Sequence, residues 1–183
     1  VTSYFAPAAR FGSPSELQAL IDAAHALGLG VLLELVHSHA SSNTREGLSG
    51  LDGNDDGGYF VAGRHQEWGS RLFDFAKLEV RRFFLANLAW WATAYRVDGF
   101  RFDLAGILGE KDLDYNTPIP VSGTIVQEIA DDPVMQEHNV RLISEPWTAS
   151  GTGPGIGGFP MSSNLEDFGW GEWNAHFRDW WRA

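Results

Sequence analysis

The chain contains no cysteine among its 183 residues. Disulfide bonds and thiolate chemistry are therefore excluded, because both require a cysteine sulfur. A run of about 20 apolar residues is also missing, so the sequence predicts no membrane-spanning helix. The first residues, VTSYF, lack the charged head and apolar run of a signal peptide, and we expect an internal piece of a longer gene product. The cell compartment stays open, with the cytoplasm favoured.

Basic residues are scarce, because 13 lysines and arginines stand against 24 acidic residues and the net charge is −11. A surface this acidic repels nucleic-acid phosphates and anionic membranes, and the basic residues form no cluster. The sequence therefore predicts neither a nucleic-acid partner nor a membrane partner. Tryptophan, in contrast, is abundant, with eight residues. Flat aromatic faces suit neutral partners such as sugar rings, although core packing is the commoner use of any single tryptophan.

Short aliphatic segments alternate with helical patterns along the chain. A capped helix start at residues 13–16 (SPSE) opens the first helix, which is expected to stop at Gly28. Further helices are expected over 77–95, 123–130 and 172–182, and strands over 31–36, 97–102 and 140–144. Ser122 is the expected cap of the helix over 123–130. Trp173, Phe177 and Trp180 are expected on one face of the last helix. Residues 40–73 lack any period and are expected to form an excursion, and residues 151–171 a glycine-rich loop. The alternation predicts an α/β fold with a parallel sheet.

Polar side chains gather where the three expected strands end. The first strand ends at His37 and His39, the second at Arg101 and Asp103, and the third at Glu145. Because the carboxyl ends of parallel strands meet at one edge of a sheet, we expect these side chains to share a cleft.

A pair of carboxylates is what glycoside cleavage with retention requires. One attacks or stabilises the anomeric carbon, and the other protonates the departing oxygen. A cation such as Arg101 favours an ionised neighbouring acid, and apolar cover such as Trp147 raises the pKa of the other acid. The pattern therefore favours Asp103 as the nucleophile and Glu145 as the general acid and base.

Each of these residues also has a structural interpretation. Asp103 would serve as a helix cap, Glu145 as a loop carboxylate and Arg101 as part of an ion pair. His37 and His39, which share a strand face, would suit a metal, but no third ligand is obvious in the sequence.

Three segments resemble successive signature regions of the α-amylase superfamily, glycoside hydrolase family 13. They are residues 34–39 (ELVHSH), 99–103 (GFRFD) and 143–147 (ISEPW), in matching order and spacing. The resemblance implies a (β/α)8 TIM barrel, of which residues 1–183 would form one partial catalytic domain covering about strands 3 to 5. Residues 40–73 would be its short inserted domain. A complete barrel needs roughly 250 residues, which agrees with a partial one.

The resemblance also implies a role for each site residue. Asp103 corresponds to the nucleophile and Glu145 to the general acid and base. Arg101 corresponds to the arginine beside the nucleophile and His39 to a histidine that contacts the bound sugar, with Trp147 as a further substrate-binding residue. No cofactor and no metal are implied for this chain.

Two branches of the superfamily are represented. The segments that resemble glucan branching enzymes are 4–7 (YFAP), 10–12 (RFG), 36–41 (VHSHAS), 68–73 (WGSRLF) and 87–91 (NLAWW). Those that resemble isoamylase-type debranching enzymes are 145–147 (EPW), 158–160 (GFP), 172–174 (EWN) and 177–179 (FRD). The larger share favours branching.

The chain departs from the family pattern at three places. Glu34 stands where the family usually has aspartate, and Ser38 where many members have asparagine. The last signature region, which carries the third catalytic carboxylate, is absent, and neither Asp167 nor Glu172 matches it.

The expected function is that of a retaining enzyme of the 1,4-α-glucan branching type, which acts on α-1,4/α-1,6-glucans through a covalent glycosyl intermediate. An α-1,6 debranching hydrolase is one alternative. The other is a catalytically inert fragment or a non-catalytic glucan binder.

Overall fold

The computed structural model describes residues 3–43, 45–47, 57–65, 70–105, 108, 124–145, 169–173 and 175–182. The elements are a 3-10 helix η1 (Ala9–Phe11), helices α1 (Pro14–Ala26), α3 (Leu78–Ala94), α4 (Ile125–Ala130), α5 (Pro133–Glu137) and α6 (Ala175–Arg182), and strands β1 (Leu32–Leu35), β2 (His39–Ala40), β3 (Phe60–His65), β4 (Arg71–Phe73), β5 (Gly99–Phe102), β6 (Arg141–Ser144) and β7 (Trp170–Glu172).

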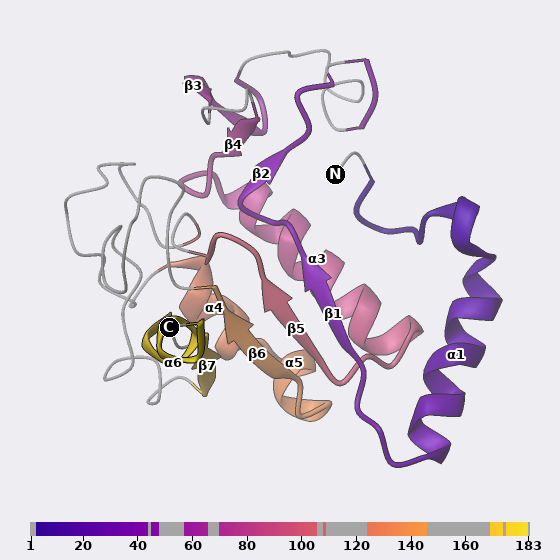
Figure 1. Cartoon of the computed structure of the whole chain (residues 1–183). Coiled ribbons are helices and arrows are strands. Elements are labelled where there is room, and N and C mark those ends of the chain that lie inside the picture. The colour runs from indigo at the N-terminus through magenta and orange to yellow at the C-terminus, as the bar shows by residue number, and fades with distance from the viewer. Residues whose placement is uncertain are drawn as a thin grey trace.

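The main sheet is parallel, with the strand order β1-β5-β6-β7. Helices α3, α4 and α5 cover one of its faces, and α1 lies beside the edge strand β1 (Figure 1). All four residues of β5 are buried, as expected of a strand with a neighbour on each side and helices on one face. The α/β fold with a parallel sheet is therefore confirmed.

The start of α1 follows from its first residues. The Ser13 side chain accepts a hydrogen bond from the backbone N–H of Glu16, and the Glu16 carboxylate accepts one from the Ser13 N–H at 2.7 Å. This reciprocal pair satisfies two N–H groups that a helix start otherwise leaves without partners. At the other end, Gly28 adopts φ = +73°, a conformation that glycine reaches without steric cost.

The end of the chain differs from the sequence-based expectation. Residues 151–171 were expected to form a loop, but Trp170 and Gly171 belong to β7, which pairs with β6 from Leu142↔Trp170 to Ser144↔Glu172. A three-residue strand is too short to show a period. The last helix, expected from Glu172, begins at Ala175.

Helix α5 was not expected from the sequence, although it carries a start signal. The Asp132 side chain accepts hydrogen bonds from the N–H groups of Val134 and Met135, and Pro133 occupies the first turn. The helix has only five residues, which is too few for a recognisable apolar stripe. Ser122, the expected cap of α4, lies outside the described residues.

Strands β2, β4 and β3 form a second, antiparallel sheet, separate from the parallel one (Figure 1). It falls within the segment 39–73, and the assignment of residues 40–73 to an inserted domain stays a prediction. In the described part of the chain, no helix is both long and apolar enough to cross a membrane.

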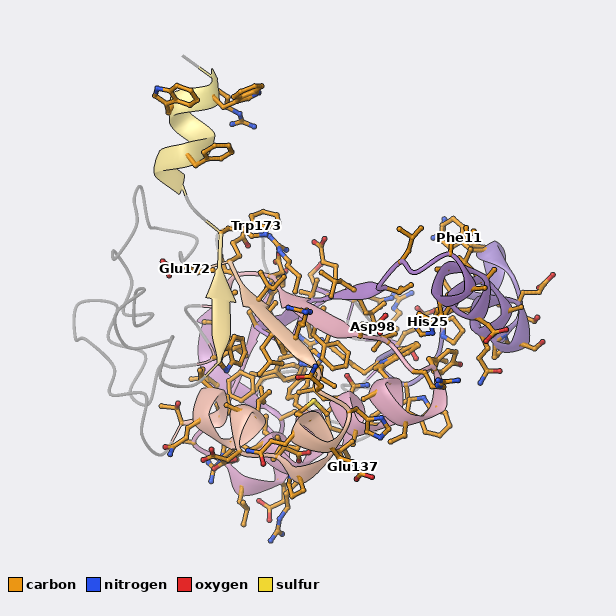
Figure 2. All side chains as sticks on the ribbon, turned by 90° about the horizontal axis from the view of Figure 1, so that it is seen from below. Phe11, His25, Asp98, Glu137, Glu172 and Trp173 are labelled. Atoms are coloured by element: carbon orange, nitrogen blue, oxygen red, sulfur yellow. The ribbon has the colours of Figure 1, made fainter. Side chains whose placement is uncertain are left out.

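The amino ends of β1 and β5 are joined to α1 by one carboxylate. Asp98, directly before β5, accepts a hydrogen bond from the backbone N–H of Val31 at 2.6 Å and lies 2.8 Å from the His25 ring nitrogen. Figure 2 shows His25 and Asp98 at the opposite end of the sheet from Trp173. The amino edge therefore has a structural polar cluster of its own, remote from the carboxyl edge.

Close packing between strands makes one glycine indispensable. A Cβ on Gly99 would lie 2.5 Å from the Arg141 carbonyl oxygen and 2.6 Å from a Leu32 methyl group. We therefore expect Gly99→Ala to lower the free energy of unfolding by about 2 to 3 kcal/mol, measured by urea denaturation. The matched control is Gly171→Ala in β7, whose Cβ would meet its nearest atom at 3.7 Å and which should change stability by less than about 1 kcal/mol. Equal effects of the two substitutions would contradict this account.

Candidate active site

The register of the parallel sheet brings the candidate residues together. Glu34 on β1 lies opposite Arg101 on β5. The ladder continues past the strand ends, because the N–H of Asp103 donates to Leu35 and the N–H of Glu145 donates to the carbonyl of the residue before Asp103. The carboxyl ends of β1, β5 and β6 are thus held side by side, and their side chains meet at one edge.

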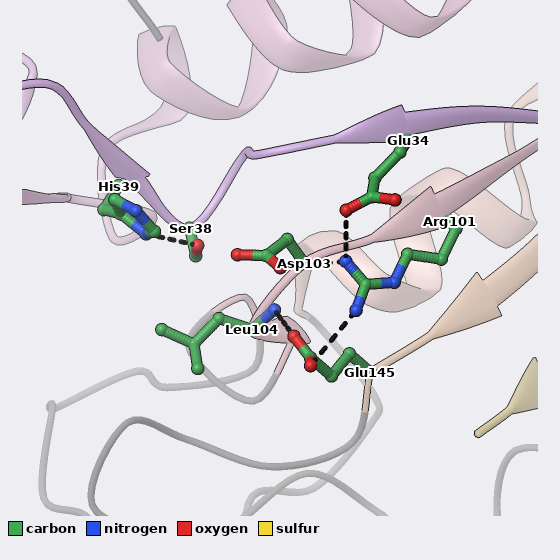
Figure 3. A network of polar contacts seen from close by, with 7 residues as sticks. All are labelled: Glu34, Ser38, His39, Arg101, Asp103, Leu104 and Glu145. Carbon is green, nitrogen blue, oxygen red and sulfur yellow. Dashed lines mark hydrogen bonds and ion pairs between the residues drawn. The ribbon is translucent and has the colours of Figure 1, made fainter.

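Arg101 joins three carboxylates (Figure 3). Its Nη1 lies 2.8 Å from an oxygen of Glu34 and 2.8 Å from an oxygen of Asp103. Its Nη2 lies 3.1 Å from an oxygen of Glu145. The Arg101 side chain is only 9% exposed, so its ion pairs with Asp103 and Glu145 are screened less by water than surface pairs are, whereas Glu34 is 65% exposed. A single guanidinium therefore fixes the relative positions of Asp103 and Glu145.

Glu145 has a second anchor, in the backbone beyond β5. Its Oε2 accepts a hydrogen bond from the N–H of Leu104 at 2.8 Å, and its carbonyl accepts one from the N–H of Ala105. Leu104 adopts φ = 50°, in the left-handed region that costs a non-glycine residue roughly 1 to 2 kcal/mol. That backbone conformation aims an N–H group at the Glu145 carboxylate.

Burial raises the pKa of Glu145 above its ordinary value. The Leu104 N–H and the Arg101 guanidinium act in the opposite direction, and the nearby charge of Asp103 adds to the rise. Glu145 therefore keeps a proton to higher pH than an ordinary glutamate does. This is the property that a general acid beside an anionic partner needs.

His39 lies on the Asp103 side of the cluster (Figure 3). Its Nδ1 is 2.8 Å from the Ser38 hydroxyl, a contact that restrains the orientation of the ring. Burial lowers the pKa of His39, and the charge of Asp103 partly opposes that change. His39 is thus close enough to Asp103 to interact with it electrostatically.

His37 points into the core instead. Its Nε2 lies 2.9 Å from the Asn87 side-chain oxygen, and burial lowers its pKa to about 3, against the effect of that hydrogen bond. The imidazole is therefore neutral in ordinary buffers. The two histidines are in different environments, and the described residues include no group of three His, Cys, Asp or Glu side chains suited to a metal ion.

Two tryptophans, Trp147 and Trp173, differ in how they relate to the predicted site. Trp147, expected to bind substrate, lies outside the described residues. Trp173 was expected on the apolar face of a helix, and that was wrong. It directly follows β7, and its ring centre lies 4.0 Å from Cζ of Arg101. The rule that functional residues follow parallel strands would have found Trp173, had the three-residue strand been recognised.

Relatives and solved structures support the resemblance that the sequence suggests. No family model matches the chain. The chain is 53% identical over 108 residues to the 1,4-alpha-glucan-branching enzyme of Saccharomyces cerevisiae, a match that covers 56% of this chain and 15% of that enzyme. The Bacillus subtilis type I pullulanase complexed with maltose aligns with a TM-score of 0.59 and 26% identity, over 90% of this chain and 22% of its own. An α-amylase from Lactobacillus plantarum aligns with a TM-score of 0.66 and 19% identity, over 100% of this chain and 42% of its own.

The described fold is thus part of a β/α barrel of the α-amylase superfamily type, with its polar cluster at the carboxyl ends of the strands. By sequence, the chain resembles the 1,4-α-glucan-branching enzymes over about half of its length, and its resemblance to the pullulanase is more distant.

The electrostatic coupling within the cluster gives a prediction about Glu145. Because the charge of Asp103 raises the pKa of Glu145, Asp103→Asn should lower that pKa. The measurement is a 13C NMR titration of the Glu145 carboxyl carbon, assigned by its loss in Glu145→Gln. Asp98→Asn, at the opposite end of the sheet, is the control and should leave the titration unchanged. An unchanged or higher pKa in Asp103→Asn would show that the two carboxyl groups do not interact.

Proposed function

We propose that this chain is part of a retaining α-glucan-active enzyme of the 1,4-α-glucan branching type. The observation that carries the proposal is the single Arg101 guanidinium, which contacts both Asp103 and Glu145 at the ends of neighbouring parallel strands. The resemblance to branching enzymes supports the subtype. The matched part spans only 15% of the yeast enzyme, so the activity, substrate and residue roles are proposals for the whole protein.

The first chemical step breaks the glycosidic bond. Glu145 donates its proton to the departing oxygen while an oxygen of Asp103 forms a bond to the anomeric carbon. The released chain end leaves with the proton of Glu145, and the donor chain stays attached to Asp103 as an ester. The raised pKa of Glu145 supports its role as the proton donor.

The second step reverses the roles at Glu145. Its carboxylate takes the proton of an incoming 6-hydroxyl, the hydroxyl oxygen bonds to the anomeric carbon, and the bond to Asp103 breaks. Two successive inversions retain the α-configuration. In this scheme Arg101 and His39 hold the site around the bound sugar, and Trp147 is a further substrate-binding candidate.

The proposed partner is a neutral α-1,4/α-1,6-glucan. The net charge of −11 agrees with a neutral ligand and with the absence of nucleic-acid or anionic-membrane partners expected from the sequence. No cofactor takes part in either chemical step, because the two carboxylates carry out all the proton and bond transfers. The cytoplasmic location stays a prediction.

The branching proposal is tested with the protein expressed from its native gene. Branching activity should lower the iodine staining of amylose without releasing reducing sugar, because the cleaved chain passes to a hydroxyl group and not to water. Glu145→Gln should lower this activity by about 10² to 10⁴-fold. The matched control is Glu137→Gln on the surface of α5, which should retain full activity. Equal activity in the two variants would remove Glu145 from the mechanism.

Debranching is the second candidate, since residues 172–174 and 177–179 resemble isoamylase-type enzymes and the Bacillus subtilis pullulanase shares the fold at 26% identity. A debranching enzyme would release reducing ends from amylopectin and leave linear amylose unchanged. A non-catalytic glucan binder would show neither reaction but would be retained on a starch column. The 183-residue chain by itself should show weak or no turnover, because the third carboxylate implied by the resemblance is not in it.

A further inference from the structure

One aromatic ring covers the guanidinium at the centre of the candidate site. The ring centre of Trp173 lies 4.0 Å from Cζ of Arg101, within the range of a cation–π contact. The ring contributes to the burial that leaves the Arg101 side chain only 9% exposed. Trp173 itself stands at the carboxyl end of β7, before α6 projects beyond the sheet (Figure 2).

The backbone of Trp173 is tied to the strand that carries Glu145. Its N–H donates to the carbonyl of Ser144, the residue immediately before Glu145, at 3.0 Å. This bond fixes the backbone position from which the ring reaches Arg101. Arg101 on one strand and Glu145 on the next are thus connected a second time, through Trp173.

The polar contacts of Arg101 leave one edge of its guanidinium, at Nε, without a partner among the described residues. Nη1 contacts Glu34 and Asp103, and Nη2 contacts Glu145. Its Nε is buried and has no hydrogen-bond partner among the described residues. The flat faces of a guanidinium are weakly hydrated and stack well on aromatic rings. A ring on one face supplies the restraint that the Nε edge lacks.

We propose that Trp173 is a positioning residue that holds the Arg101 guanidinium in the orientation that joins the two catalytic carboxylates. The expected effect on kcat rests on the proposed function, but the contact between Trp173 and Arg101 can be tested without any turnover. Arg101 lowers the pKa of Glu145, so a loosened Arg101 should let that pKa rise further. Among the described residues, the charged and titratable groups around Glu145 at this end of the sheet are Glu34 from β1, His39 from β2, Arg101 in β5, Asp103 directly after it and Glu172 from β7.

The test compares Trp173→Leu, which removes the aromatic face, with Trp173→Phe, which keeps a smaller one. Trp180→Leu on α6 is the matched control, because Trp180 is 72% exposed and its ring contacts are with Phe177 and Trp181. All variants are made in the protein expressed from its native gene. The readouts are the 13C titration of Glu145 and the separate values of kcat and KM on amylose.

Trp173→Leu should raise the pKa of Glu145 and lower kcat by about 5- to 30-fold with little change in KM. Trp173→Phe should recover part of both, and Trp180→Leu should match the wild-type protein. An unmoved Glu145 titration together with a raised KM and unchanged kcat would overturn the proposal and make Trp173 a substrate contact.

A measurement on the wild-type protein tests the contact between Trp173 and Arg101 directly. A proton held against an indole face resonates upfield, so the Nε–H of Arg101, assigned by its loss in Arg101→Lys, should show this ring-current shift. Its absence would overturn the proposal. Lack of turnover in the wild-type protein, with the ring-current shift and the Glu145 titration as expected, would instead contradict the proposed function alone.

Discussion

The candidate site depends on a charge imbalance around Arg101. One guanidinium contacts Glu34, Asp103 and Glu145, so three carboxyl groups share a single cation. Such a group cannot carry all three negative charges without a large electrostatic cost, particularly for its most buried member. Glu145 is only 13% exposed, against 30% for Asp103 and 65% for Glu34, and its burial raises its pKa, with the charge of Asp103 adding to the rise. The difference in burial between Glu145 and Asp103 therefore favours Glu145 as the carboxyl group that keeps a proton.

The strand ends could be predicted because the signals are local and repeated. Residues 31–36, 97–102 and 140–144 are short aliphatic or aromatic runs, each followed by polar side chains, and parallel pairing then brings those ends to one edge. The capping box at Ser13 was equally readable, since Glu16 completes it within one turn. These predictions needed only neighbours in the sequence and the rule that parallel strands share an edge.

The remaining features depend on contacts between distant segments. His37 and His39 look equivalent in the sequence, yet one ring bonds to Asn87, 50 residues away, and the other bonds to Ser38 within electrostatic reach of Asp103. The ion pair between Glu34 and Arg101 depends on a strand register that no local pattern specifies. Strand β7 has three residues and no period, so the sequence hid both the strand and the position of Trp173.

The two resemblances meet at Arg101, and this bears on the choice between branching and debranching. The side that resembles branching enzymes supplies Arg101 and Asp103, and the side that resembles debranching enzymes supplies Glu145 and Trp173. Arg101 contacts all three of the others, so the cluster is one physical unit and not two alternative sites.

Breaking the glycosidic bond and forming the glycosyl intermediate are the same reaction in both enzyme types. The two activities differ in the linkage that is cleaved, α-1,4 for branching and α-1,6 for debranching, and in whether a sugar hydroxyl or water reaches that intermediate. Selection of the linkage and of the acceptor is therefore a task for residues around this cluster.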